Sequence, residues 1–423
     1  MAFMSLALAA LAFQGSVIPK PSQQAVIAFV DVHVIPMNQA GILDHQTVIV
    51  RGGRIAAIGP TGHVHVAAGA TIIDGRGKYL MPGLGEMHGH LPNPSAGPEL
   101  TENVLFLYVA NGVTAVRGMQ GSLAHLELKA RIARGELLGP QLWVPGPPLT
   151  GNSAPTPESG RRLVEEQHAT GFDELNIAEG LGREAYDTIV DAAKRLGIRF
   201  GGRVPDAVGL PYALKSGQVL IDDLDDYVSA VGGPDSITEA KLAQVAAATC
   251  AAHTWTLPAL LSSEDSAALA ARPELRYVPS AWRLSWAQQF SQQPRSTPIA
   301  LRRRILKALQ VAGCPMALGT DSPKIYSVPG FSVQREMQSM AAAGLSPQQI
   351  LGEATFQVAR YFGAEQEFGS VAPGQRADLL LLTANPLSDL ANVGRRAGVM
   401  VSGRWLPEAE IEARLERIAT AYQ

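Results

Sequence analysis

The order of apolar and polar positions divides the chain into two β-rich ends and a middle in which strands and helices alternate. From Ala25 to about Asp74, short runs of β-branched residues are separated by glycines, a pattern typical of strands and turns. The stretch Arg51-Gly-Gly-Arg54 between two apolar runs predicts a β-hairpin. Residues 366–406 repeat this strand-and-turn pattern. We therefore expect segments 25–82 and 366–406 to pair into one small β-sandwich.

The middle of the chain, residues 83–365, predicts a parallel sheet. Helical runs such as 183–197 and 299–313 alternate with apolar runs. Eight such repeats over about 280 residues match a (β/α)8 TIM barrel, so the predicted fold class is α/β, with a helix expected over 407–423. The strand segments are PGLGEMHGH (82–90), 112–118, 140–146, 173–180, 198–205, 217–224, 253–261 and 314–321.

The first residues predict a processed leader. The apolar stretch Met1–Phe13 is too short to span a bilayer, and its length suits the apolar part of a secretory signal, although the first basic residue is Lys20. We interpret residues 1–24 as a signal peptide remnant and expect a periplasmic or secreted protein. The alternative is a cytoplasmic enzyme with a misassigned start. No later segment reaches transmembrane length without charges.

Charge and cysteine content narrow the function classes. The formal net charge is −3 and there is no basic run, which argues against nucleic-acid binding. The expected partners are a small-molecule substrate and further copies of the chain in a homo-oligomer. Cys250 and Cys314 are the only cysteines, and their apolar surroundings predict two buried free thiols. A disulfide framework and a cysteine-based zinc site are both excluded on this reasoning.

Candidate metal ligands end the first and last predicted barrel strands. Active sites of TIM barrels lie at the carboxyl ends of the strands. His88 and His90 end the first strand, and their H-x-H spacing puts both imidazoles on one face, about 7 Å apart along the chain, where they can bind one ion. His63 and His65 have the same spacing within the β-rich N-terminal region, and we interpret them as surface residues.

Asp321 ends the eighth predicted strand, which lies beside the first if the barrel closes. It can then reach the same ion as His88 and His90, and it is placed to take a proton from an activated water. The alternative for an aspartate at a strand end is a helix N-cap. Together the three residues predict a site for one divalent ion, with zinc the expected metal and an empty site the alternative.

Several motifs resemble the amidohydrolase superfamily, namely PGLGEMHGHLP, GLGREAYDTIVDAAKRLGIRFGGRVPDAVGL, LGTDSP and GSVAPGQRADLLLLTANPL. The nearest branch looks like the imidazolonepropionase and Xaa-Pro dipeptidase relatives, and the resemblance covers about residues 28–406. It implies a two-metal centre. In that centre the H-x-H pair and the strand-eight Asp bind one ion, a carboxylated Lys ending strand four bridges to a second, and one His each from strands five and six complete it.

The chain departs from this pattern at the second ion. The Lys position falls on Asn176, and the two His positions fall on Arg203 and Asp223. Asn cannot be carboxylated, and a permanent guanidinium charge repels a cation. We therefore predict an Arg203–Asp223 ion pair in this pocket, with one or two hydrogen bonds, and Glu174 as a further partner.

Other singled-out residues are expected at supporting positions. Tyr326, on a loop over the barrel mouth, is a candidate substrate contact. Trp255, Trp282 and Trp286 either line a pocket or pack in the core. The remaining histidines are expected at the core or rim (His253) and in solvent on helices (His125 and His168).

Two functions follow from these residues. The first is a metal-dependent hydrolase that cleaves the C–N bond of a small amide, dipeptide-like or N-acyl amino acid substrate, with one activated water and Asp321 as general base. The alternative is a catalytically inactive protein of the same fold, a pseudoenzyme, that binds a ligand or supports an active paralogue.

Overall fold

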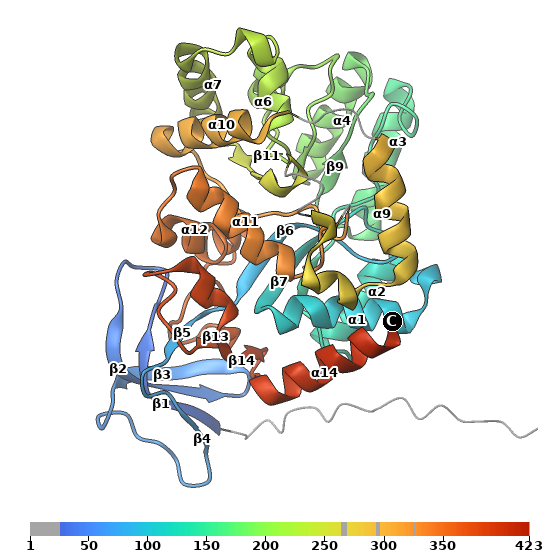
Figure 1. The fold of residues 1–423 in the computed structure, drawn as a ribbon. Helices are drawn as coiled ribbons and strands as arrows, with labels where there is room; N and C mark the ends of the chain where they lie inside the picture. The colour runs from blue at the N-terminus through green and yellow to red at the C-terminus, as the bar shows by residue number, and fades with distance from the viewer. Residues whose placement is uncertain (1–25, 264–268, 293–296, 325, 423) are drawn as a thin grey trace, which may run out of the picture.

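Parallel strands and a separate, mostly antiparallel sheet form two regions of the molecule (Figure 1). The structure is a computed structural model that describes residues 26–263, 269–292, 297–324 and 326–422. The predicted signal segment 1–24 lies outside these residues. Within them, no helix combines the length and the apolar character needed to cross a membrane.

The parallel strands form two sheets. One contains β6 (Leu84–His90), β7 (Val113–Met119) and β8 (Gln141–Trp143), and the other β9 (Leu175–Ile177), β10 (Phe200–Gly202), β11 (Leu220–Ile221) and β12 (Trp255–Thr256). All these pairs are parallel, which confirms the α/β class. The eighth predicted strand, 314–321, makes only an isolated bridge to β12, and the chain just after it bridges to β6. Among the described residues the ladder is therefore not closed, and barrel closure stays a prediction.

Helices separate the strands along the chain. The predicted helices over 183–197 and 299–313 are α4 and α10, each ended by a glycine in the left-handed conformation, Gly197 and Gly313. The helices are α1 (Pro98–Ala110), α2 (Leu123–Ala133), α3 (Pro157–Thr170), α4 (Arg183–Leu196), α5 (Leu210–Ser216), α6 (Asp225–Ala230), α7 (Glu239–Ala251), α9 (Ser280–Gln292), α10 (Ile299–Ala312), α11 (Phe331–Ala342), α12 (Pro347–Glu353), α13 (Phe356–Phe362) and α14 (Glu408–Ala421).

The second region joins both ends of the chain in one sheet. Its order is β15-β14-β13-β5-β1-β2-β3, with β4 beside β1, and the antiparallel β5–β13 pair connects the two ends. The predicted hairpin is present, because Gly52 and Gly53 form a two-residue turn with positive φ angles of 58° and 78°. The strands are β1 (Val26–Val34), β2 (Leu43–Arg51), β3 (Arg54–Pro60), β4 (Thr71–Asp74), β5 (Tyr79–Pro82), β13 (Leu379–Leu382), β14 (Arg396–Val401) and β15 (Arg404–Pro407).

The two cysteines form a disulfide bond, so the prediction of free thiols was wrong. Cys250 lies in the last turn of α7 and Cys314 follows α10, and the packing of these helices brings the two Cα atoms to 4.6 Å. The residues are 64 positions apart, and nothing in the local sequence reports the helix packing that joins them. The bond ties α7 to the segment that leads to Asp321.

Breaking this disulfide is expected to destabilise the protein. A cross-link closing a loop of this length contributes about 2–4 kcal/mol, in large part by constraining the unfolded chain. We expect a reductant to lower the free energy of unfolding, measured in urea, by about this amount. The double variant Cys250→Ser with Cys314→Ser should be insensitive to reductant. A thiol assay in denaturant that titrates two free thiols per unreduced chain would contradict the assignment.

Candidate functional site

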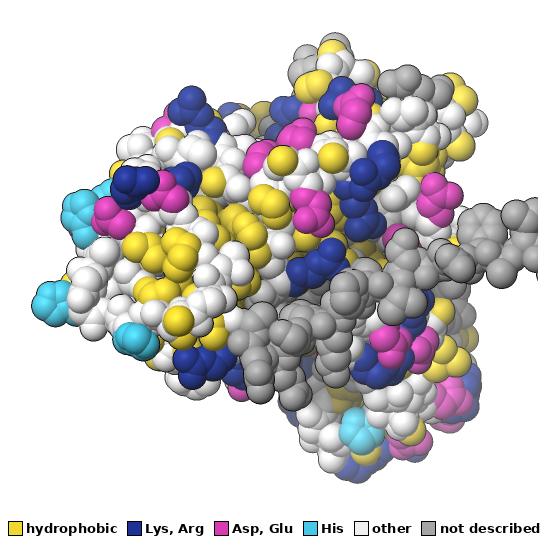
Figure 2. Space-filling model, turned by 90° about the horizontal axis from the view of Figure 1, so that it is seen from below, with side chains coloured by type: hydrophobic (Ala, Val, Ile, Leu, Met, Phe, Trp, Pro, Cys, Tyr) yellow, Lys and Arg dark blue, Asp and Glu magenta, His cyan; other side chains and the backbone are white. Residues whose placement is uncertain are grey.

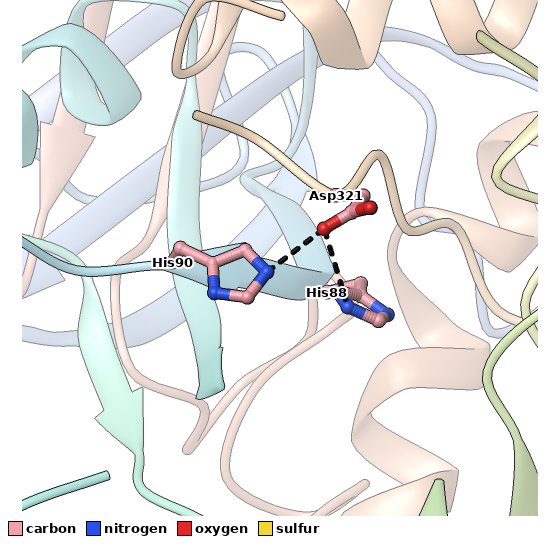
Figure 3. A group of neighbouring side chains, drawn as sticks. All are labelled: His88, His90 and Asp321. Carbon is pink, nitrogen blue, oxygen red and sulfur yellow. Dashed lines mark hydrogen bonds and ion pairs between the residues drawn. The ribbon is translucent and has the colours of Figure 1, made fainter. Parts of the chain in front are cut away.

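The three predicted metal ligands converge at the end of β6 (Figure 3). His90 Nε2 lies 2.8 Å and His88 Nε2 lies 3.5 Å from Asp321 Oδ1. One ligand atom from each side chain lies within 4.8 Å of the other two, and no other group of three His, Cys, Asp or Glu residues does this within the described chain. All three side chains are largely buried.

Backbone pairing brings Asp321 to the histidines. The segment before Asp321 runs beside β6, where the N–H of Met87 donates to Leu318 O, and the N–H of His90 donates to Ser322 O at 2.6 Å. Asp321 itself has a positive φ of 59°, an uncommon conformation for a residue with a side chain. The resulting turn directs its carboxylate back over the end of β6. The predicted juxtaposition of the two strand ends is therefore present.

The electrostatics of the three side chains suit a cation. Burial lowers the pKa of His88, which favours the neutral imidazole that a metal requires. Burial alone would raise the pKa of Asp321, but the interactions with His88, the hydrogen bond from His90 and the ammonium of Lys324 together bring it well below its usual value. The site therefore presents the neutral imidazole of His88 beside an ionised carboxylate.

A divalent metal ion fits this donor set. Both histidines use Nε2 toward Asp321, and the buried Nδ1 of His88 has no hydrogen-bond partner among the described residues. The nearest acid to that Nδ1 is Asp222, whose Oδ2 lies 3.9 Å away. Carboxylates commonly orient metal-binding histidines through the second ring nitrogen. Nitrogen and carboxylate donors of this kind suit zinc and similar transition metals.

The positions that the sequence predicts for a second metal contain the predicted ion pair. Arg203 Nη1 lies 2.6 Å from Asp223 Oδ2, at the ends of β10 and β11. The contact is a single hydrogen bond, because Nη2 of Arg203 turns to Asp226 at 3.2 Å, and the other oxygen of Asp223 accepts from Arg302 at 2.7 Å. Asn176 is buried on β9. Asp223 and Asp226 thus both have a guanidinium partner.

The predicted role of Glu174 as a partner of Arg203 was wrong. Glu174 instead pairs with Arg117, a fully buried residue of β7, and accepts a hydrogen bond from Tyr361. Arg117 also reaches Asp222 at 3.2 Å. Glu174 and Asp222 thus both contact the buried guanidinium of Arg117. A buried guanidinium is stable only with such ionic partners at contact distance. Sequence reasoning missed Arg117, which lies within an otherwise apolar strand.

Two further residues near the ligands were not predicted. Glu86 accepts from the backbone N–H groups of both His88 and Thr320, and so ties β6 to the Asp321 segment. Burial raises the pKa of Glu86 to about 7. Lys324 lies with Nζ 2.8 Å from Asp321 Oδ2, whereas the histidines contact Oδ1. The only sequence signal for Lys324 is its position three residues after Asp321.

The remaining aromatic candidates pack against other rings. Tyr326 is buried, packs edge-on against Trp286, and lines a pocket of about 460 Å³ with Arg272, Arg276 and Arg283. Its role as a substrate contact stays a prediction. Trp282 contacts Trp286, and Trp255 packs edge-on against Tyr361, so packing accounts for all three tryptophans.

Of the other histidines, only His125 differs from expectation. His63, His65 and His168 are exposed as predicted, and His253 is an exposed residue in the turn before β12. His125 is buried on α2, where its Nε2 lies 3.1 Å from Pro92 O. The prediction of a solvated side chain failed there because the helix turns this position toward the loop that follows β6.

Parallel strands with a histidine–carboxylate centre at their ends define an α/β protein of the metal-dependent hydrolase type. A model of the amidohydrolase family matches residues 79–406. The chain therefore belongs to the amidohydrolase family.

Similar proteins cover most of the chain. An imidazolonepropionase of Cereibacter sphaeroides is 25% identical over 390 residues, which span 83% of this chain and 91% of the relative. An adenine deaminase of Rubrobacter xylanophilus is also 25% identical, over 91% of this chain and 59% of the relative. Among solved structures, a putative prolidase from Bifidobacterium longum aligns with a TM-score of 0.69 at 24% identity, covering 93% of this chain and 99% of that chain.

Removing the buried guanidinium of Arg117 is expected to destabilise the protein. Arg117→Met leaves Glu174 and Asp222 buried without their shared counter-charge, so the free energy of unfolding should fall by about 3–5 kcal/mol. The matched control is Arg162→Met, which removes an exposed pair with Glu166 on α3 and should change nothing measurable. Urea unfolding measures both variants. Equal small effects in the two would mean that the buried network does not stabilise the fold.

Proposed function

We propose that this protein is a hydrolase that cleaves the C–N bond of a small amide with a single divalent ion, most simply zinc, held by His88, His90 and Asp321. The observation that carries the proposal is the convergence of two Nε2 atoms and one carboxylate, next to second-metal positions filled by an ion pair. Three protein ligands with one open position are a workable catalytic zinc arrangement. We also propose that the parallel strands close into the eight-stranded barrel of the family.

The residues of the chain divide the reaction between them. A bound divalent ion would supply activation of water and polarisation of the substrate carbonyl. Asp321 takes the proton of the attacking water and passes it to the leaving nitrogen, so that water and amide become a carboxylate and an amine. Asp222, held by Arg117, faces Nδ1 of His88 and orients that imidazole.

The relatives support a small substrate with a C–N bond. Imidazolonepropionases and adenine deaminases are among the similar sequences, and a putative prolidase and a bottromycin amidohydrolase are among the similar structures. We propose a dipeptide-like, N-acyl amino acid or cyclic amide substrate for this chain. On the face seen in Figure 2, Lys and Arg side chains are interspersed with Asp and Glu, which agrees with a small-molecule partner rather than a nucleic acid.

An oxidising compartment fits the disulfide. Disulfide bonds persist in the periplasm and outside the cell and are rare in the reducing cytosol. The Cys250–Cys314 bond therefore supports the proposal that the protein is exported.

The second candidate function is a ligand-binding protein without catalysis. The observation that favours it is the filled second-metal pocket, where Arg203 and Arg302 neutralise Asp223. Such a protein would keep the fold and the substrate pocket but lack turnover. Metal content and hydrolysis separate the two candidates.

The purified chain is expected to bind about one zinc ion and to hydrolyse N-acyl amino acids in a chelator-sensitive reaction. His88→Ala with His90→Ala should abolish both, because only Asp321 remains as a ligand. His63→Ala with His65→Ala is the control, since it removes an exposed pair of identical spacing. Elemental analysis and an amine-release assay measure the outcome. Less than about a tenth of an ion per chain after metal supplementation, without turnover, would contradict the proposal.

A further inference from the structure

The two oxygens of the Asp321 carboxylate face different partners. Nε2 atoms of His90 and His88 lie 2.8 and 3.5 Å from Oδ1, whereas Nζ of Lys324 lies 2.8 Å from Oδ2. The Lys324 side chain is 55% exposed, so a ligand entering from solvent can reach it. The carboxylate therefore lies between the candidate metal position and a cation that is open to solvent.

The neighbouring acids are already neutralised by other cations. Asp223 contacts Arg203 and Arg302, and Asp226 contacts Arg203. Within the described residues, Asp321 is the acid in ionic contact with Lys324. Lys324 and Asp321 thus balance one another as long as no further cation is present.

A divalent ion changes this balance. An ion on Oδ1 and an ammonium on Oδ2 share a single negative charge, and the two cations repel one another at short range. The ammonium consequently lowers the affinity of the site for metal. Once an ion is bound, Lys324 is short of a counter-charge, and an anionic group arriving from solvent can supply it.

We propose that Lys324 competes with the metal for Asp321 and, in the metal-loaded protein, binds the carboxylate of an anionic substrate. This inference rests on the proposed function and narrows its substrate class to amides that carry a free carboxylate close to the scissile bond. Lys324 is then a specificity-determining residue, with Asp321 as the group it shares with the ion.

The competition is tested by zinc titration of the metal-free protein with calorimetry. Lys324→Met should bind zinc about tenfold more tightly than the wild type, because the repelling charge is gone. Lys324→Arg keeps the charge and should bind as the wild type does. Lys307→Met, which removes an ammonium that contacts Gln310 and Gly344 on the outside of α10, is the control and should also be unchanged. An unchanged or weaker zinc affinity in Lys324→Met overturns the inference.

The recognition step is tested on the zinc-loaded proteins with N-methylsulfonyl-L-alanine, a sulfonamide that resists hydrolysis, and with its primary amide. The wild type and Lys324→Arg should bind the acid about tenfold more tightly than the amide, and Lys324→Met should lose this preference. A preference retained in Lys324→Met overturns the assignment of the carboxylate. If the wild type binds no zinc, the proposed function fails first, whereas zinc binding that Lys324→Met leaves unchanged contradicts this inference alone.

Discussion

The candidate site depends on the parallel contact between β6 and the segment that ends at Asp321. Two backbone hydrogen bonds, from Met87 to Leu318 and from His90 to Ser322, fix the register of these segments. A slip of one residue would turn both histidines to the opposite face of the strand. The buried Glu86 accepts hydrogen bonds from the N–H and the hydroxyl of Thr320 across the same contact. Backbone pairing therefore determines where the side chains of His88, His90 and Asp321 lie relative to one another.

Carboxylates at the strand ends require cations, and the chain supplies them from its own side chains. Arg203 and Arg302 contact Asp223, and Arg117 contacts Asp222. A buried acid without a counter-charge is strongly destabilising, so these guanidinium partners stabilise the fold. Unlike a bound metal ion, the guanidinium of an arginine side chain cannot dissociate from the protein. Arg203, which the sequence places at a position predicted to hold a second ion, thus brings a permanent positive charge there.

The sequence predicted correctly which side chains meet where the ends of parallel strands determine their positions. The His88, His90 and Asp321 group and the Arg203–Asp223 pair were predictable because the carboxyl ends of parallel strands meet at one edge. The disulfide was missed because it depends on how α7 and α10 pack. The partner of Glu174 was missed because Arg117 lies on a fully buried strand, where no alternation of apolar and polar residues marks the side it faces. Lys324 was missed because a loop, not a strand, positions it.

The candidate metal position lies within a series of charged and polar side chains at the strand ends. Arg117 contacts Asp222, Asp222 faces His88, His88 faces Asp321, and Asp321 contacts Lys324. Lys324 is therefore separated from the metal position by the carboxylate of Asp321, and Arg117 by Asp222 and the imidazole of His88. A second divalent ion would add charge to a region that already carries Lys324 and Arg203 as permanent cations. The same side chains that neutralise the acids therefore oppose the binding of a second cation, which is consistent with the proposed single-ion centre.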